Sequence, residues 1–372
     1  MSKRNNRKIW KAVLCIVFST SLAFVLSNTV VYYFTSMLAF KSSIEENDYQ
    51  IIDLYSVVLD ENSSPMVSDN IVLVTVDGLP REDIASVVEI IKKADSKVIG
   101  IDIIFEYKCG IDSALLEATN ASNIVLAATV DGDFKLHKSY FCDSLHKAYS
   151  GVALLEQPSP ISMVRQYRTK YFIGDSLYNT FATEIIRRSG EKVKHYDDDN
   201  QYIFYPAIDF MTIESDILVQ NPEKCKEFFK DKIVLVGDDK NMQDVHPTAF
   251  GAMSGLRIQA SIIETILGDH RITTWPKWVE WMMAIISCIL LIIVNMILAN
   301  KMPTIGKLLF RFFQLIILYG CFTLGCSIFK NHYLYVDITP TLSMIAVGLL
   351  AYDFWNGISL LIDKYILKNN KT

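Results

Sequence analysis

The chain has 372 residues, 51% of them hydrophobic, and a formal net charge of −5. Its mean hydropathy of +0.25 excludes an ordinary soluble protein of this length, so we expect membrane-spanning segments. Outside residues 12–279 there are 12 basic and 4 acidic residues, a net of +8, which leaves −13 for residues 12–279. So acidic a region does not bind nucleic acid through counterion release. It suits cations, or ligands that are bound through local polar groups rather than through long-range attraction.

Four apolar stretches are long enough to cross a bilayer. The first follows a basic start and is long and uncharged, which favours an uncleaved signal anchor over a cleaved signal peptide. Lysine and arginine flank the connection between the second and third spans and also the tail, which predicts that both termini are cytoplasmic. The predicted organisation is a cytoplasmic basic N-terminus at 1–8, a signal anchor at 9–36, an extracytoplasmic domain at 37–278, spans at 279–299, 308–329 and 336–355, and a cytoplasmic tail at 356–372.

Strand and helix patterns alternate through the exported region. Apolar spacing predicts a helix within residues 41–62, a second after Pro80, a third at 176–188 and a fourth at 255–267. Residues 135–147 have no clear period and are interpreted as a loop or insertion. Short β-branched or aromatic runs predict strands at 71–76, 98–105, 123–129, 151–155, 202–205 and 233–236. The alternation predicts a layered α/β domain with a largely parallel sheet flanked by helices, joined to four transmembrane helices.

Residues 231–267 place a polar loop between a buried strand and an amphipathic helix. The loop contains Asp244, His246 and Thr248, and Gln259 lies at the edge of the apolar stripe of the helix. Ligands of open α/β sheets bind outside the carboxyl ends of the strands, so the loop is a candidate ligand-binding site. Aspartate and threonine near a helix start also act as caps, which leaves a structural role open.

Asp102 is unusual because it lies within the apolar run 98–105. A buried carboxylate is costly unless it is paired or hydrogen bonded. In one interpretation Asp102 is structural and accepts backbone hydrogen bonds or pairs with Arg81. In the other, Asp77 and Asp102 lie at the ends of neighbouring strands and form one cleft with residues 244–248.

The seven cysteines do not form a disulfide framework. Four lie in predicted spans, where they serve as small packing residues. The three in the exported region allow at most one disulfide, and a bridge between Cys109 and Cys142 is left open. Their spacing matches no metal signature, so we expect neither a metal nor another cofactor.

Several segments occur in a specific order: 76–81 (VDGLPR), 100–105 (GIDIIF), 232–237 (KIVLVG), Asp244 with Thr248, and 255–260 (GLRIQA), followed by three closely spaced spans. Over about residues 40–360 this order resembles the type 2 CHASE domain family of bacterial extracytoplasmic sensors. One departure is Pro247-Thr248, where the family usually has Thr-Pro. Carried onto this chain, the polar positions of the family are Asp77, Arg81, Asp102, Asp244 and Gln259.

The resemblance implies a sensor of the bacterial cytoplasmic membrane that detects an unidentified small-molecule or environmental stimulus. Family members pass the signal to a cytoplasmic nucleotide cyclase or to a histidine or serine/threonine kinase. Only about 17 residues follow the last predicted span, so we expect a non-enzymatic protein that relays to a separate kinase or cyclase. The helix 255–267 leads into the second span and is the expected route. A homodimer is compatible with the sequence.

Two alternatives remain. The chain could be an exported metal-dependent hydrolase that uses carboxylates and a histidine as ligands or as acid and base, namely Asp77, Asp102, Asp244 and His246. The absence of Gly-x-Ser-x-Gly, HExxH and paired-cysteine motifs argues against this class. It could also be a structural subunit of a membrane complex, in which the polar loop only packs.

Overall fold

The computed structural model describes residues 2–41, 50–61, 66–110, 112–133, 135–142, 146–157, 162–193, 200–205, 208–301 and 305–369. The chain forms two compact units. The helical unit comprises Met1–Tyr55 and Thr273–Thr372, and the α/β unit comprises Ser56–Ile272. The predicted fold class is confirmed, because a mostly parallel sheet flanked by helices accompanies four long apolar helices.

The α/β unit contains a seven-stranded sheet of order β10-β1-β11-β2-β3-β4, in which β5 also pairs with β3. The β3–β4 pair is antiparallel, and the others are parallel. Buried parallel strands are typically rich in valine, isoleucine and leucine, and the central strand β11 has the sequence IVLVG. The strands are β1 (Met66–Thr75), β2 (Val98–Ile101), β3 (Ile124–Val130), β4 (Leu136–Lys138), β5 (Tyr149–Val152), β10 (Ile208–Glu214) and β11 (Ile233–Gly237).

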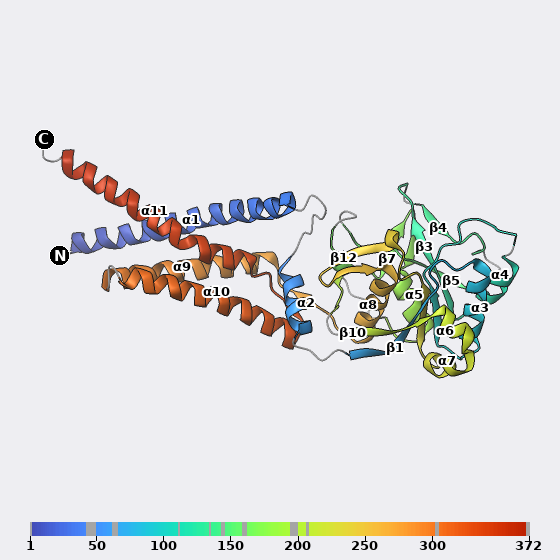
Figure 1. The fold of residues 1–372 in the computed structure, drawn as a ribbon. Helices are drawn as coiled ribbons and strands as arrows, with labels where there is room; N and C mark the ends of the chain where they lie inside the picture. The colour runs from blue at the N-terminus through green and yellow to red at the C-terminus, as the bar shows by residue number, and fades with distance from the viewer. Residues whose placement is uncertain are drawn as a thin grey trace. The chain divides into compact units, whose positions relative to one another are not determined.

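Helices cover both faces of the sheet, because alternate strand residues point to opposite sides. Val72 and Val74 of β1 belong to the core on one face, and Ile71 and Leu73 belong to the core on the other. The first face is covered by α3 (Arg81–Lys92), α4 (Ser113–Thr119), α6 (Ser215–Gln220) and α7 (Pro222–Phe229). The second is covered by α5 (Phe181–Arg188) and α8 (Gly255–Leu267), as Figure 1 shows.

Three short hairpins or bridges surround this core. β6 (Gln166–Tyr167) pairs with β9 (Gln201–Tyr202), and β7 (Lys170–Ile173) pairs with β8 (Ser176–Asn179). After β11, a 3₁₀ turn (Met242–Asp244) leads into the hairpin of β12 (Val245–Thr248) and β13 (Gly251–Ser254). The polar loop predicted between the strand and helix of residues 231–267 is therefore partly a β-hairpin that ends at the start of α8.

Several sequence predictions need correction. Part of the predicted loop at 135–147 forms strand β4, and the strand predicted at 202–205 is confined to β9. The strand predicted at 98–105 ends at Ile101, so Asp102 follows the strand rather than lying in it. Residues 176–179 form strand β8 instead of the first turn of a helix, because Gly174, with φ of +59°, makes the tight turn that a hairpin requires. The strands before Asp77 and Asp102 are not neighbours, since β11 lies between them. The optional bridge between Cys109 and Cys142 does not form.

Among the described residues, the helical unit contains four helices that are long and apolar enough to cross a membrane. The apolar spans are Ile9–Asn28, Lys277–Lys301, Leu309–His332 and Thr339–Lys364. They belong to α1 (Ser2–Lys41), α9 (Lys277–Lys301), α10 (Ile305–His332) and α11 (Thr339–Asn369). α11 packs against α1 and α9 in one apolar cluster and against α9 and α10 in another. α9 and α11 each share an apolar cluster with all the other helices of the bundle.

The close contact between α5 and the sheet depends on Gly151 in β5. A Cβ atom added to Gly151 would lie 2.5 Å from the Cα atom of Phe181 and 2.9 Å from its backbone nitrogen. Backbone atoms of a packed helix cannot move away as a flexible side chain can. A side chain at position 151 would therefore push α5 off the sheet.

We expect Gly151→Ala to lower the free energy of unfolding of the α/β unit by about 3 kcal/mol, the upper range for an overpacked core. Chemical denaturation of the full chain in detergent measures this. Gly132→Ala is the matched control, because an added Cβ at Gly132 meets no atom within 4 Å. Equal stability of the two variants would contradict the close packing of α5.

Candidate functional site

Three adjacent parallel strands end in aspartates at the same edge of the sheet. β1 is followed by Asp77, β11 by Asp238 and β2 by Asp102. The register aligns Thr75 with Gly237 and Val236 with Ile101, so the three strands end at nearly the same level. The carboxyl edge of the sheet therefore gathers carboxylates from three separate parts of the sequence.

Asp102 is held by its backbone, whereas its carboxylate has no direct partner among the described residues. Its backbone nitrogen donates a 2.8 Å hydrogen bond to the carbonyl oxygen of Val236. The electrostatic neighbours of its carboxylate are Asp244, Asp238 and His246, and no hydrogen bond from the described residues reaches it. A Cβ added to Gly237 would lie only 3.2 Å from the Cβ of Asp102, so this glycine leaves room for the aspartate.

Burial is the main reason why the pKa of Asp102 rises to about 7, and the negative charges of Asp244 and Asp238 raise it further. His246 acts in the opposite direction. The pKa of Asp238 is also raised, first by burial and then by Asp77 and Asp244. The cluster of Asp102, Asp238 and Asp244 is therefore electrostatically unfavourable when all three are ionised.

His246 lies beside this cluster and bonds to two acceptors. Its Nε2 atom is 3.2 Å from Oδ1 of Asp244, and its Nδ1 atom is 3.0 Å from Oε1 of Gln157. The amide nitrogen of Gln157 donates to the carbonyl oxygen of Ser162, which fixes the orientation of the amide. The two ring nitrogens thus join His246 to Asp244 on one side and to Gln157 on the other.

Asp244 also lies against the start of α8. A Cβ added to Gly255, the first residue of the helix, would be 2.6 Å from Oδ2 of Asp244. The positive end of a helix dipole favours a carboxylate in this position. Gly255 therefore permits the contact that joins the acidic cluster to α8.

Asp77 orders the loop after β11 and does not face the cluster with a free carboxylate. Its Oδ1 atom accepts hydrogen bonds of 2.8 Å and 2.7 Å from the backbone nitrogens of Asp239 and Lys240. The tip of β1 thereby holds the loop that carries Asp238 and Asp244.

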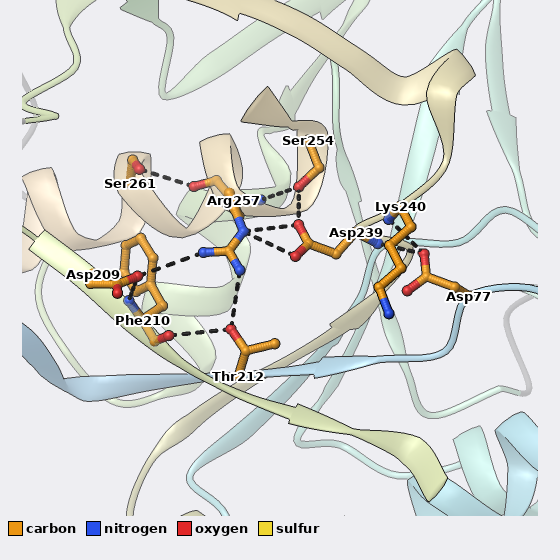
Figure 2. Close-up of polar contacts among 9 residues, drawn as sticks. All are labelled: Asp77, Asp209, Phe210, Thr212, Asp239, Lys240, Ser254, Arg257 and Ser261. Carbon is orange, nitrogen blue, oxygen red and sulfur yellow. Dashed lines mark hydrogen bonds and ion pairs between the residues drawn. The ribbon is translucent and has the colours of Figure 1, made fainter. Parts of the chain in front are cut away.

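Arg257 was not among the site residues predicted from the sequence. It links the same loop to α8 through an ion pair with Asp239. Figure 2 shows its guanidinium among Asp239, Asp209 and Thr212. Its Nε atom donates to both carboxylate oxygens of Asp239 at 2.9 Å and 3.0 Å, and Nη1 lies 3.6 Å from Asp209. An arginine in the first turn faces the positive end of the helix dipole, which is unfavourable. That anomaly was the sequence signal that could have identified it.

Asp239 is the ionised partner in this junction. Burial opposes its ionisation, but hydrogen bonds from Arg257 and Ser254 outweigh burial and lower the pKa of Asp239. Ser254 also caps α8, accepting a hydrogen bond from the backbone nitrogen of Arg257. The loop, the cap and the first turn of α8 are thus tied together.

The other predicted site residues use their polar groups elsewhere. Arg81 pairs with Asp112 at 2.9 Å and not with Asp102. The Thr248 hydroxyl donates to the carbonyl oxygen of Gly251 within the β12–β13 turn. Gln259 is buried, and its amide donates to the carbonyl oxygen of Ala153. The structure brings Asp102, Asp244 and His246 together, with Asp77 supporting them.

The site does not resemble a metal centre. Within the described ranges, no group of three or more His, Cys, Asp or Glu side chains is arranged to hold a metal ion.

The raised pKa of Asp102 predicts a pH-dependent stability. The folded state keeps this proton up to about pH 7, whereas an unfolded aspartate loses it near pH 3.9, so stability falls as the pH rises between these values. Asparagine cannot ionise and avoids this loss. We therefore expect Asp102→Asn to be more stable than the wild type at pH 8 by roughly 2–4 kcal/mol, and equal to it near pH 4, in denaturant titrations of the full chain.

Asp112→Asn is the contrasting control. Burial raises the pKa of Asp112, but hydrogen bonds from Tyr140, Cys109 and Arg81 outweigh burial and leave it lowered. Removing this buried partner of Arg81 is expected to cost about 3 kcal/mol at pH 8. A loss of stability in Asp102→Asn at pH 8 comparable to that in Asp112→Asn would show that Asp102 is a paired structural residue.

Comparison with known proteins identifies the family. The model of the CHASE2 domain family matches residues 25–294, which is 270 of the 372 residues. No curated protein and no solved structure matches the chain significantly. CHASE2 is a family of extracytoplasmic sensory domains, and the match confirms the resemblance seen in the motif order. The chain belongs to the CHASE2 domain family.

Proposed function

We propose that this chain is a membrane sensor whose α/β unit responds to its stimulus at the carboxyl edge of the sheet. One observation carries the proposal: the Asp102 carboxylate lies beside Asp238, Asp244 and His246 and has no direct partner among the described residues. The cluster lies where ligands of α/β sheets usually bind, and its carboxylates repel one another. Binding of a ligand would therefore change their ionisation and their mutual repulsion.

A stimulus that brings positive charge fits this cluster best. A bound ammonium group, a hydrated cation or a proton would relieve the repulsion among the three carboxylates. A neutral or anionic ligand would have to overcome it. The acidic character of residues 12–279, with a net charge of −13, supports the same ligand class through long-range attraction.

The response would reach the membrane through α8. Asp244 contacts the first residue of this helix, and Arg257 in its first turn binds Asp239 from the same loop. Nine residues, 268–276, then connect α8 to the membrane-spanning α9. If the loop has two conformations, a ligand can change the free-energy difference between them by no more than the difference in its binding free energy to the two.

The topology and output belong to the same proposal. The distribution of lysine and arginine supports cytoplasmic termini and an α/β unit outside the bacterial cytoplasmic membrane. We propose a non-enzymatic relay to a separate kinase or cyclase, and a homodimer is compatible with this relay. Crosslinking in native membranes tests the relay, and recovery of neither class of protein would contradict it.

A ligand screen on the full chain in lipid nanodiscs tests the site. We expect an amine or divalent cation to raise the melting temperature saturably; at 100 times its Kd, a ligand adds about 2.7 kcal/mol of stability. Asp102→Asn should abolish this shift. The exposed Asp133→Asn should retain it.

Two results would overturn the assignment. A ligand-induced shift that persists in Asp102→Asn would place the binding site elsewhere. No shift with any cation or amine, together with unchanged pH dependence in Asp102→Asn, would favour a structural role for the cluster.

A further inference from the structure

The α/β unit is joined to the helical unit by two stretches of chain. One passes through α2 (Ile51–Glu61), between Tyr55 and Ser56, and the other passes between Ile272 and Thr273. Inside the helical unit both stretches lead to the turn between α10 and α11. We call residues 329–337 the α10–α11 corner.

The first stretch is anchored by Tyr55. Its side chain is buried, and its ring lies 6.0 Å from that of Phe322, 5.7 Å from that of Phe329 and 6.3 Å from that of Tyr335. Its hydroxyl donates a 3.4 Å hydrogen bond to the carbonyl oxygen of Val336. α2 continues from Tyr55 to Glu61 as one helix. A displacement of its far end therefore acts directly on Tyr55.

The side chain of Tyr55 packs directly against Gly325 of α10. A Cβ added at this position would lie 2.0 Å from the Tyr55 hydroxyl oxygen and 2.8 Å from Cζ. These distances are far below van der Waals contact, so any side chain at position 325 displaces the tyrosine. The glycine is needed for this close approach, since an α-helix otherwise favours alanine.

The second stretch is anchored by a short parallel ladder. β14 (Thr273–Thr274) pairs with β15 (Leu334–Tyr335), and the backbone nitrogen of Thr273 donates to the carbonyl oxygen of Tyr333 at 2.9 Å. Tyr335 thus lies opposite Thr274 in the ladder and beside the ring of Tyr55. One residue of the corner touches both stretches.

The corner is continuous with α11. This helix begins two residues after the corner, at Thr339, whose backbone nitrogen donates to Asp337. Farther along, Asp353 pairs with Arg311 of α10 at 2.6 Å, and Asp363 pairs with Lys11 of α1 at 3.1 Å. A displacement of the corner is therefore delivered to a helix that contacts α1, α9 and α10.

We infer that movements carried by both stretches enter the membrane bundle together at the α10–α11 corner, and that Tyr55, which packs against Gly325, couples the two stretches there. The inference goes beyond the proposed stimulus site, because it rests only on contacts within the helical unit. It assigns signal entry to α10 and α11 in addition to α9, which follows the second stretch in sequence.

Hydrogen exchange of the full chain in nanodiscs, read by mass spectrometry, tests this coupling. We expect Gly325→Ala to increase exchange at least about tenfold in residues 51–55, and also in 273–274 and 334–337, because expelling Tyr55 removes the support of Tyr335. Gly320→Ala, in the same helix, should change none of these segments, since an added Cβ there meets no atom within 4 Å.

A second pair of variants keeps the test decisive if Gly325→Ala fails to fold. Tyr55→Ala should reproduce the loss of protection in both stretches, whereas the exposed Leu54→Ala should not. Increased exchange in 51–55 alone would show that the two stretches are independent and would overturn the inference. Unchanged exchange in 51–55 would show that Tyr55 does not anchor α2.

Discussion

The pairing of β11 between β1 and β2 is the constraint on which the rest of the α/β unit depends. Parallel pairing on both sides brings three strand ends level, and each is followed by an aspartate: Asp77, Asp238 and Asp102. Both faces of these strands are covered by helices, and the aspartates that follow the strand ends lie at the carboxyl edge of the sheet. The position of the acidic cluster is thus a consequence of strand order.

The cluster is unfavourable by itself, and the neighbouring interactions show how the fold tolerates it. Two residues hold the loop after β11. Asp77 accepts a hydrogen bond from the loop backbone, and Arg257 pairs with the side chain of Asp239 in the loop. On the opposite face, the buried carboxylate of Asp112 accepts hydrogen bonds from Arg81 and Tyr140. Functional sites commonly retain such local conflicts because the surrounding structure over-determines them. Asp102 differs from Asp112 in having no such partner within the described chain.

In the helical unit, the corresponding constraint is close packing of side chains rather than charge. Gly325 allows Tyr55 to sit against α10, and Tyr335 lies between that tyrosine and the β14–β15 ladder. A packed contact of this kind has few alternatives, because a shift of one side chain requires its neighbours to move. In a CHASE2 sensor, this gives the two chain connections a common attachment beside the start of α11.

Much of this organisation was determined by the sequence alone. Apolar length predicted the four spans, β-branched runs predicted the strands around 71–76 and 233–236, and the motif order predicted the family. These features depend on residues close together in the chain. Only the tertiary structure decided that β11 separates β1 from β2, that Arg257 binds Asp239, and that Gly325 receives Tyr55. Such pairings join residues distant in sequence, and local periodicity carries no information about which distant partner a strand or side chain will meet.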